Sequence, residues 1–108
     1  MKIAAVIPAY NEAKNLSRVL KPLRECPELA EVIVVSDGST DGTAAVARIM
    51  GARVIELPQN RGKGAAVQAG LQATTAEVIL LLDADLIGLT PRHVQDLLTP
   101  IFTQQAMM

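Results

Sequence analysis

Two carboxylates stand directly after an apolar run, in the order Asp83-Ala84-Asp85. The run before them, 78–82, is too short for a stable helix and predicts a central strand, buried on both faces of a parallel sheet. Ligands of open α/β sheets bind outside the carboxyl ends of the strands, so both acids are expected at a ligand site. Their oxygens suit a hard cation such as Mg²⁺ or Mn²⁺, completed by water and substrate phosphates. On an extended chain the two side chains would point to opposite faces unless the backbone turns at Ala84. The alternative interpretation is a solvated acidic turn.

Three further turns, at 8–12, 36–43 and 59–64, carry polar residues that a protein core would not select. Each follows an expected strand, so the carboxyl edge of the sheet would bring them together with the two aspartates. The residues expected around this crevice are Tyr10, Glu12, Asp37, Asp41, Arg61, Lys63, Asp83 and Asp85. Acids for a metal, bases for phosphates and glycines for close backbone approach together indicate a nucleoside-diphosphate site.

The elements that must position these turns alternate along the chain. Strands are expected at 2–7, 31–35, 53–57 and 78–82, and helices at 13–23 (with the end no later than 26–27), about 43–50, 65–71 and from 91 onward. Pro22 is expected to kink the first helix or stop it early, Gly51 to end the second, and Thr90 to cap the fourth. This alternation predicts one α/β domain with a Rossmann-like, mostly parallel sheet covered by helices on both faces.

Composition excludes several function classes. The 108 residues allow one domain, and 10 Lys plus Arg against 11 Asp plus Glu give no bulk charge for nucleic acid or an anionic membrane. One tyrosine and one phenylalanine are too few aromatics for a base-stacking platform. No apolar stretch approaches the roughly 18 residues of a membrane span. The single cysteine, Cys26, has no partner in the chain, so a reducing, cytoplasmic setting is expected.

Two common phosphate-binding motifs are missing from the glycine-rich turn. A dinucleotide fingerprint would need glycine where Val67 stands, and a P-loop would need glycine where Leu57 stands. A sugar-phosphate nucleotidyltransferase would need a glycine-rich loop after the first strand, where the chain has Pro8-Ala9-Tyr10-Asn11-Glu12.

Taken together, four motifs in this order and spacing resemble family 2 glycosyltransferases of the GT-A fold. They are Pro8-Ala9-Tyr10-Asn11-Glu12, the run from Asp37 to Thr43, Asn60-Arg61-Gly62-Lys63-Gly64 and Asp83-Ala84-Asp85. The resemblance extends from the first strand to about residue 106. It implies a nucleotide-binding half of about four strands and a divalent cation, Mg²⁺ or Mn²⁺.

The resemblance also implies roles for individual residues. Pro8, Ala9, Tyr10 and Glu12 would line the nucleoside pocket, and Asp37 would hydrogen-bond the base. Arg61 and Lys63 would lie near the base and the diphosphate. Asp83 and Asp85 would meet the ribose and the cation, with Asp85 favoured as the direct ligand.

Each of these roles has a simpler alternative. Tyr10 could be a packed turn residue, Glu12 a residue that favours a helix N-terminus, and the basic turn merely solvated. Asp41, with Ser39 or Thr40, is expected to cap a helix rather than to contact ligand.

The activity implied is transfer of a sugar from a UDP- or GDP-linked donor to a phosphoglycerate, polyprenyl phosphate or saccharide acceptor. Members of the family continue past the Asp-x-Asp strand into an acceptor half, so we interpret residues 1–108 as a donor-binding half, truncated before that part. No residue offers a catalytic base, because Asp96 is expected to face solvent. The alternatives are a catalytically silent nucleotide-binding module and a sugar-phosphate nucleotidyltransferase. The last helix would expose an apolar face that favours self-association.

Overall fold

Strands and helices alternate as the sequence predicts in the computed structural model, which describes residues 2–98. The elements are β1 (Ile3–Ala9), α1 (Leu16–Arg24), β2 (Glu31–Asp37), α2 (Thr43–Ile49), β3 (Arg53–Leu57), α3 (Lys63–Gln72) and β4 (Val78–Leu81). A further helix begins at residue 91. The four strands form one parallel sheet in the order β3-β2-β1-β4, which confirms the predicted α/β fold class.

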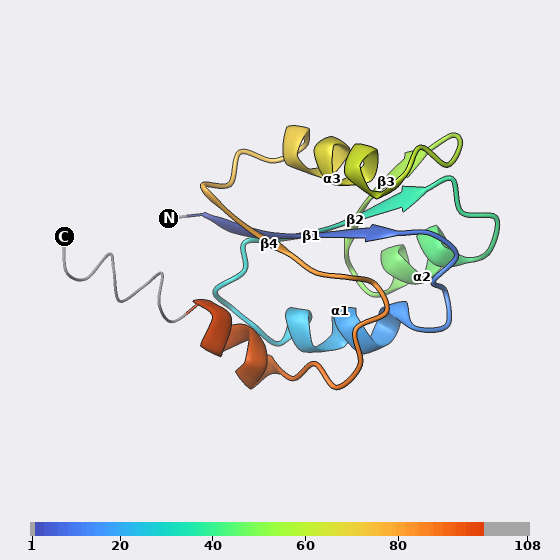
Figure 1. Cartoon of the computed structure of the whole chain (residues 1–108). Coiled ribbons are helices and arrows are strands. Elements are labelled where there is room, and N and C mark those ends of the chain that lie inside the picture. Colours follow the sequence, from blue (N-terminus) through green and yellow to red (C-terminus); the bar gives the residue numbers. More distant parts are fainter. Residues whose placement is uncertain (1, 99–108) are drawn as a thin grey trace.

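Helices cover both faces of this sheet. In Figure 1, α3 lies on one face, and α1, α2 and the last helix lie on the other. Alternate residues of β1 serve the two layers: Ile3 and Ile7 pack with Leu16 of α1, whereas Val6 packs with Ala66 of α3. Each fully buried Ile, Leu or Val side chain contributes about 1.5–3 kcal/mol through removal from water. The core therefore holds the carboxyl ends of β1 and β2 in a fixed position.

The first strand continues beyond its expected end at residue 7. Pro8 stays in register with Val35 of β2, although proline cannot donate a backbone hydrogen bond. The backbone N–H and C=O groups of the even-numbered residues of β1 point toward β4. The N–H of Leu82, for example, donates to the carbonyl of Val6 over 3.2 Å. The pairing of β1 with β4 ends at Val6 and Leu81, so the absent N–H of Pro8 lies beyond that ladder. The strand can therefore carry Pro8 and Ala9 up to the crevice.

The expectation that β4 is a central strand buried on both faces is wrong. It lies at one edge of the sheet, and among residues 2–98 no strand pairs with its other side. Residues 78–80 are only half-buried, and Leu81 is 52% exposed. The physical reason is that α3 packs mainly over β1 and β2, which leaves one face of β4 partly uncovered.

Some helix ends follow the sequence, whereas α1 begins at Leu16 instead of residue 13 and α3 begins at Lys63 instead of residue 65. An early stop at Pro22 is wrong, because α1 continues to Arg24 with Pro22 buried inside it. Gly51 has the left-handed φ of 85° expected of a residue that ends a helix. The hydroxyl of Thr90 accepts a hydrogen bond from His93 N–H over 3.2 Å, which confirms the predicted cap.

On the last helix, Leu97 is 51% exposed, and Asp96 is exposed as expected. The remaining apolar residues of the expected face, Ile101 and Phe102, lie outside the described residues, so self-association through this helix stays a prediction. Within residues 2–98, no helix has the length and apolar character to cross a bilayer.

Candidate functional site

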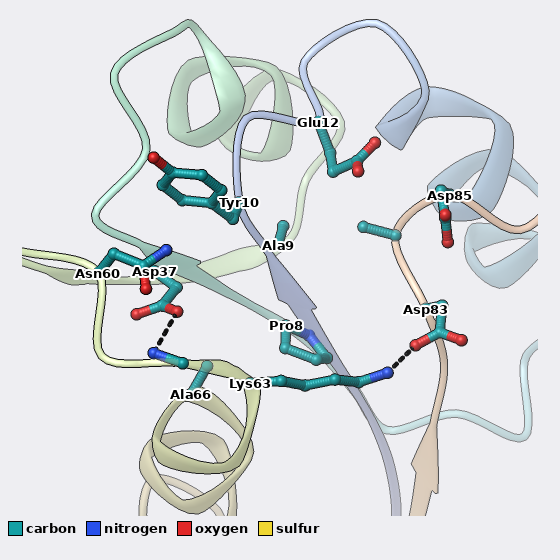
Figure 2. A pocket seen from close by; sticks show the side chains of 12 residues that line it. Pro8, Ala9, Tyr10, Glu12, Asp37, Asn60, Lys63, Ala66, Asp83 and Asp85 are labelled. Carbon is teal, nitrogen blue, oxygen red and sulfur yellow. Dashed lines mark hydrogen bonds and ion pairs between the residues drawn. The ribbon is translucent and has the colours of Figure 1, made fainter.

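A pocket of about 240 Å³ opens where β1, β2 and β4 end, beside the first turn of α3 (Figure 2). Its lining combines carboxylates, one lysine, one aromatic ring and several small residues. The lining residues are Pro8, Ala9, Tyr10, Glu12, Asp37, Asn60, Gly62, Lys63, Ala66, Asp83, Ala84 and Asp85. The position at the carboxyl ends of parallel strands is the usual ligand position of open α/β sheets.

Most of the residues expected around the crevice are found there, with two exceptions. Arg61 instead lines a separate groove along α3 with Leu57 and Gln68. Asp41 also lies outside the pocket lining. Four lining residues were not anticipated as site residues, namely Asn60, Gly62, Ala66 and Ala84. The functional roles that the resemblance implies for all of these residues stay predictions.

Asp37 fixes the basic turn to the end of β2. The residue is only 4% exposed, and its carboxylate accepts the N–H of Arg61 at Oδ1 over 2.8 Å and the N–H of Gly62 at Oδ2 over 2.9 Å. Both bonds are charge-assisted, which makes them stronger than bonds between neutral groups. The backbone of the turn is therefore fixed at Arg61, whose N–H is bound by this buried residue. Arg61 itself lines the groove along α3 and not the pocket. Asp37 thus organises the pocket wall as well as lining it.

The loop after β2 is also pressed against the loop after β3 at Gly38. Its φ is +70°, and a Cβ at this position would lie 2.3 Å from the backbone nitrogen of Asn60. No side chain can be accommodated at that distance, since the neighbouring atoms belong to backbone. Glycine is therefore required for the two loops to approach this closely.

A second set of hydrogen bonds joins the loop after β2 to the turn after β1. Asp41 accepts the N–H of Thr43 over 3.0 Å, the hydroxyl of Thr43, and the N–H of Ala13 over 3.3 Å. Thr43 in turn accepts the N–H of Glu12 over 3.0 Å. The Thr43 hydroxyl is the main cause that lowers the pKa of Asp41, with smaller contributions from the backbone N–H groups. Gly42 is the N-cap residue of α2 and has no side-chain cap, so the expected cap at Asp41 is wrong in position; Asp41 instead stabilises the start of the helix from one residue earlier, through Thr43.

Across the pocket, Lys63 forms an ion pair with Asp83. The Nζ of Lys63, at the start of α3, donates to Oδ1 of Asp83 at the end of β4 (Figure 2). This hydrogen bond, and then the charge of Asp83, raise the pKa of Lys63 above its ordinary value. The two side chains are 67% and 53% exposed, so solvent screens the pair and its contribution to stability is small.

Asp83 and Asp85 line the same pocket because the chain turns between them. The N–H of Leu86 donates to the carbonyl of Asp83 over 3.4 Å, and the buried Ala84 separates the two exposed acids. Within residues 2–98, no three His, Cys, Asp or Glu side chains gather closely enough to hold a metal ion by themselves. Two carboxylates nevertheless fit Mg²⁺ or Mn²⁺, because such ions commonly take one or two carboxylates together with water and substrate phosphates.

Comparison with known proteins gives a family match over nearly the whole chain. The model of "Glycosyl transferase family 2" matches residues 4–106. The chain is 42% identical over 94 residues to the dolichyl-phosphate beta-glucosyltransferase ALG5C of Trichomonas vaginalis, covering 74% of this chain and 28% of that protein. It is 36% identical over 112 residues to the glucosyl-3-phosphoglycerate synthase of Mycolicibacterium smegmatis, covering 94% of this chain and 36% of that protein.

Solved structures give the same result. The glucosyl-3-phosphoglycerate synthase of Mycobacterium tuberculosis in complex with UDP superposes with a TM-score of 0.84 at 33% identity, covering 94% of this chain and 40% of that one. The same enzyme with Mn²⁺, UDP-glucose and phosphoglyceric acid superposes with a TM-score of 0.82 at 33% identity, covering 93% and 39%. The chain therefore spans well under half the length of these relatives.

Proposed function

Because this chain belongs to glycosyl transferase family 2, as its four motifs predicted, we propose that it binds a nucleoside-diphosphate sugar and provides the donor site of a glycosyltransferase. The observation that carries the proposal is the pocket itself, where Lys63, Asp83 and Asp85 face one space at the carboxyl ends of the strands. A lysine for phosphate and two carboxylates for a cation are the groups that a metal-bound diphosphate needs.

The two walls of the pocket suit different parts of the donor. Tyr10, 48% exposed, and the small residues Pro8 and Ala9 offer an apolar surface for a nucleobase. Lys63 stands in the first turn of α3, where backbone N–H groups and the helix dipole also favour an anion. We therefore place the nucleoside between Tyr10 and Asp37 and the diphosphate between Lys63 and the two aspartates.

The two aspartates would hold the cation, with Asp85 as the direct ligand and Asp83 shared with the ribose. A bound Mn²⁺ or Mg²⁺ would neutralise charge that develops on the leaving diphosphate. Lys63 would add a second positive charge on the same leaving group, and its high pKa keeps it protonated at neutral pH. Mn²⁺ is supported by the complexes of the mycobacterial relative, and Mg²⁺ by the general preference of this ion for carboxylate oxygens.

For the complete enzyme we propose UDP-glucose as the donor and a phosphorylated hydroxy acid or a lipid phosphate as the acceptor class, on the strength of the relatives' names. Within residues 2–98, the other carboxylates of the pocket already have partners. Asp37 holds backbone N–H groups, and Glu12 accepts the side-chain amide of Asn15 over 3.1 Å. This favours, as the second candidate, a module that binds the donor without catalysing transfer.

Calorimetric titration of the 108-residue chain with UDP, GDP and UDP-glucose, with and without Mn²⁺, tests the proposed donor. We expect UDP and UDP-glucose to bind, and Mn²⁺ to strengthen both. Titration with AMP, which has a nucleoside but no diphosphate, serves as the control for non-specific binding. No binding of any nucleotide diphosphate, or UDP binding that Mn²⁺ leaves unchanged, would contradict the proposal.

A further inference from the structure

Two positive groups, the ammonium of Lys63 and the proposed divalent cation, would both bind the carboxylate of Asp83. This is the carboxylate that the ribose and the cation would share, and its Oδ1 already accepts the ammonium of Lys63. Lys63 is in turn the residue that would contact the diphosphate. We propose that Lys63 and the divalent cation compete for Asp83, so that each of the two ligands, cation and diphosphate, favours binding of the other through Lys63. This inference rests on the proposed donor site and concerns its regulation.

The pair can exchange partners because it is weak and open. Both side chains are more than half exposed, and an exposed ion pair contributes little net free energy. A cation at the Asp83 carboxylate would repel the Lys63 ammonium at close range. Asp85, the other carboxylate whose charge acts on Lys63, would then be engaged by the cation, so the diphosphate is the anion that a loaded pocket offers to the displaced ammonium.

Only the side chain of Lys63 needs to move. The backbone before it is fixed, because Asp37 holds the N–H groups of Arg61 and Gly62. The backbone of Lys63 itself starts α3 and is part of the helical hydrogen-bond pattern. The long side chain can therefore swing from the β4 side of the pocket to its centre while the turn stays in place.

Thermodynamic linkage relates the affinity for the cation to the affinity for the diphosphate. If diphosphate removes Lys63 from Asp83 and so strengthens cation binding, the cation must strengthen diphosphate binding by the same factor. Direct contact between the cation and the diphosphate would also couple the two ligands. The contribution of Lys63 is therefore isolated by measuring the cation alone, without nucleotide.

The experiment is Mn²⁺ titration of the 108-residue chain, followed by electron paramagnetic resonance of free Mn²⁺. Without nucleotide, Lys63→Gln should bind Mn²⁺ about two- to fivefold more tightly than the parent, the range expected for release of an exposed ion pair. Lys21→Gln removes the same charge from the exposed face of α1, outside the pocket, and should leave the affinity unchanged. In an Asp83→Asn background, the gain from Lys63→Gln should disappear.

A Lys63→Gln chain that binds Mn²⁺ no better than the parent overturns the competition, and so does absence of Mn²⁺ binding in both chains. Thermal melting confirms that both lysine variants fold. UDP titration separates this inference from the proposed function. If Lys63→Gln strengthens Mn²⁺ binding but the parent binds no UDP, the proposed donor is wrong and the competition stands. If UDP binds and Lys63→Gln leaves Mn²⁺ affinity unchanged, the donor site stands and the competition is wrong.

Discussion

The two sides of the pocket differ in how firmly the chain holds them. We call the loops 38–42 and 58–62 the β2–β3 loops, and residues 83–85 the aspartate turn. The β2–β3 loops are fixed by the buried Asp37, by the close approach at Gly38 and by the hydrogen bonds of Asp41. The aspartate turn follows an edge strand, its acids are exposed, and within residues 2–98 its ion pair is with Lys63. The side on which we propose that the nucleoside binds is thus held by internal hydrogen bonds, whereas the charged side is left available to ligands.

This difference assigns separate energetic roles to the two sides. Because the β2–β3 loops are already fixed in the fold, less conformational entropy would be lost when a ligand binds. Leaving the aspartate turn without strong internal partners keeps its carboxylates free to bind a cation without first breaking a costly interaction. Changes on the first side should therefore lower the stability of the fold, and changes on the second should alter ligand binding alone.

Gly38→Ala should give the largest loss of stability. The new Cβ would lie 2.3 Å from the backbone nitrogen of Asn60, on a residue whose φ of +70° is already unfavourable for alanine. Strain and overpacking together predict a loss of about 2–4 kcal/mol in the free energy of unfolding, measured by urea denaturation. Weaker UDP binding should accompany it, because the β2–β3 loops must separate.

Gly64→Ala is the matched control for that substitution. Gly64 lies within α3, has no left-handed φ, and has nothing within 4 Å of an added Cβ. Alanine in a helix is about 0.5–1 kcal/mol more favourable than glycine, so stability should stay equal or rise. Equal losses of unfolding free energy in the two variants would mean that the close approach at Gly38 is not the cause of the destabilisation.

Asp37→Asn should have the next largest effect. An amide can accept one of the two N–H groups with its oxygen but presents its own N–H₂ to the other, so a partly buried donor is left unpaired. The expected loss in unfolding free energy is about 1–3 kcal/mol, and nucleotide affinity should fall by a similar amount. Denaturation and UDP titration of the same sample measure both losses. Weaker UDP binding with unchanged stability would instead assign Asp37 to base recognition alone.

Asp85→Ala tests the other side of the comparison. Asp85 is exposed at the pocket, so its removal should change the unfolding free energy by no more than about 0.5 kcal/mol. The increase in UDP affinity caused by Mn²⁺ should be lost, because the proposed direct ligand is gone. Calorimetry with and without Mn²⁺ measures this difference. A variant that responds to Mn²⁺ as strongly as the parent would show that Asp85 does not bind the cation.

The sequence was sufficient for much of the fold because local chemistry determines it. The strand 53–57 and the ends at Gly51 and Thr90 are found as expected, since a β-branched run, a left-handed glycine and a capping hydroxyl each act on neighbouring backbone. The edge position of β4 was not predictable in this way. The apolar run 78–82 predicted that both faces of the strand are covered, yet residues 78–80 are only half-buried, and such a run contains no information on whether a neighbouring strand pairs with its edge.

The site shows a similar limit. Lys63 and Arg61 belong to one basic turn, yet only Lys63 faces the pocket, because Asp37 holds the backbone at Arg61 and the side chain of Arg61 lies along α3. That hydrogen bond joins residues 24 positions apart, so the turn alone could not reveal it. Ala66 was missed although it could have been found, since it lies one helical turn after Lys63 and thus on the same face of α3.

The smallest effect is expected at Asp41, where acid should weaken the fixed side of the pocket before it affects the core. The folded pKa of Asp41 is lowered, chiefly by the Thr43 hydroxyl, so its contribution to stability is present above the ordinary aspartate pKa of about 4 and is lost as pH falls through the folded pKa. Asp41→Asn should therefore be less stable than the parent at pH 7, and the difference should shrink in acid. Urea denaturation at pH 7, 5 and 3 measures it, with Asp96→Asn as the control for loss of one exposed negative charge. A difference that stays constant from pH 7 to pH 3 would mean that the hydrogen bonds from Thr43 and Ala13 do not depend on the charge of Asp41.

Asp41 also joins the loop after β2 to the turn that carries Tyr10 and Glu12. The UDP affinity of Asp41→Asn should therefore fall together with its stability. The UDP affinity of Asp96→Asn should stay at the parent value, whatever the stability of that control.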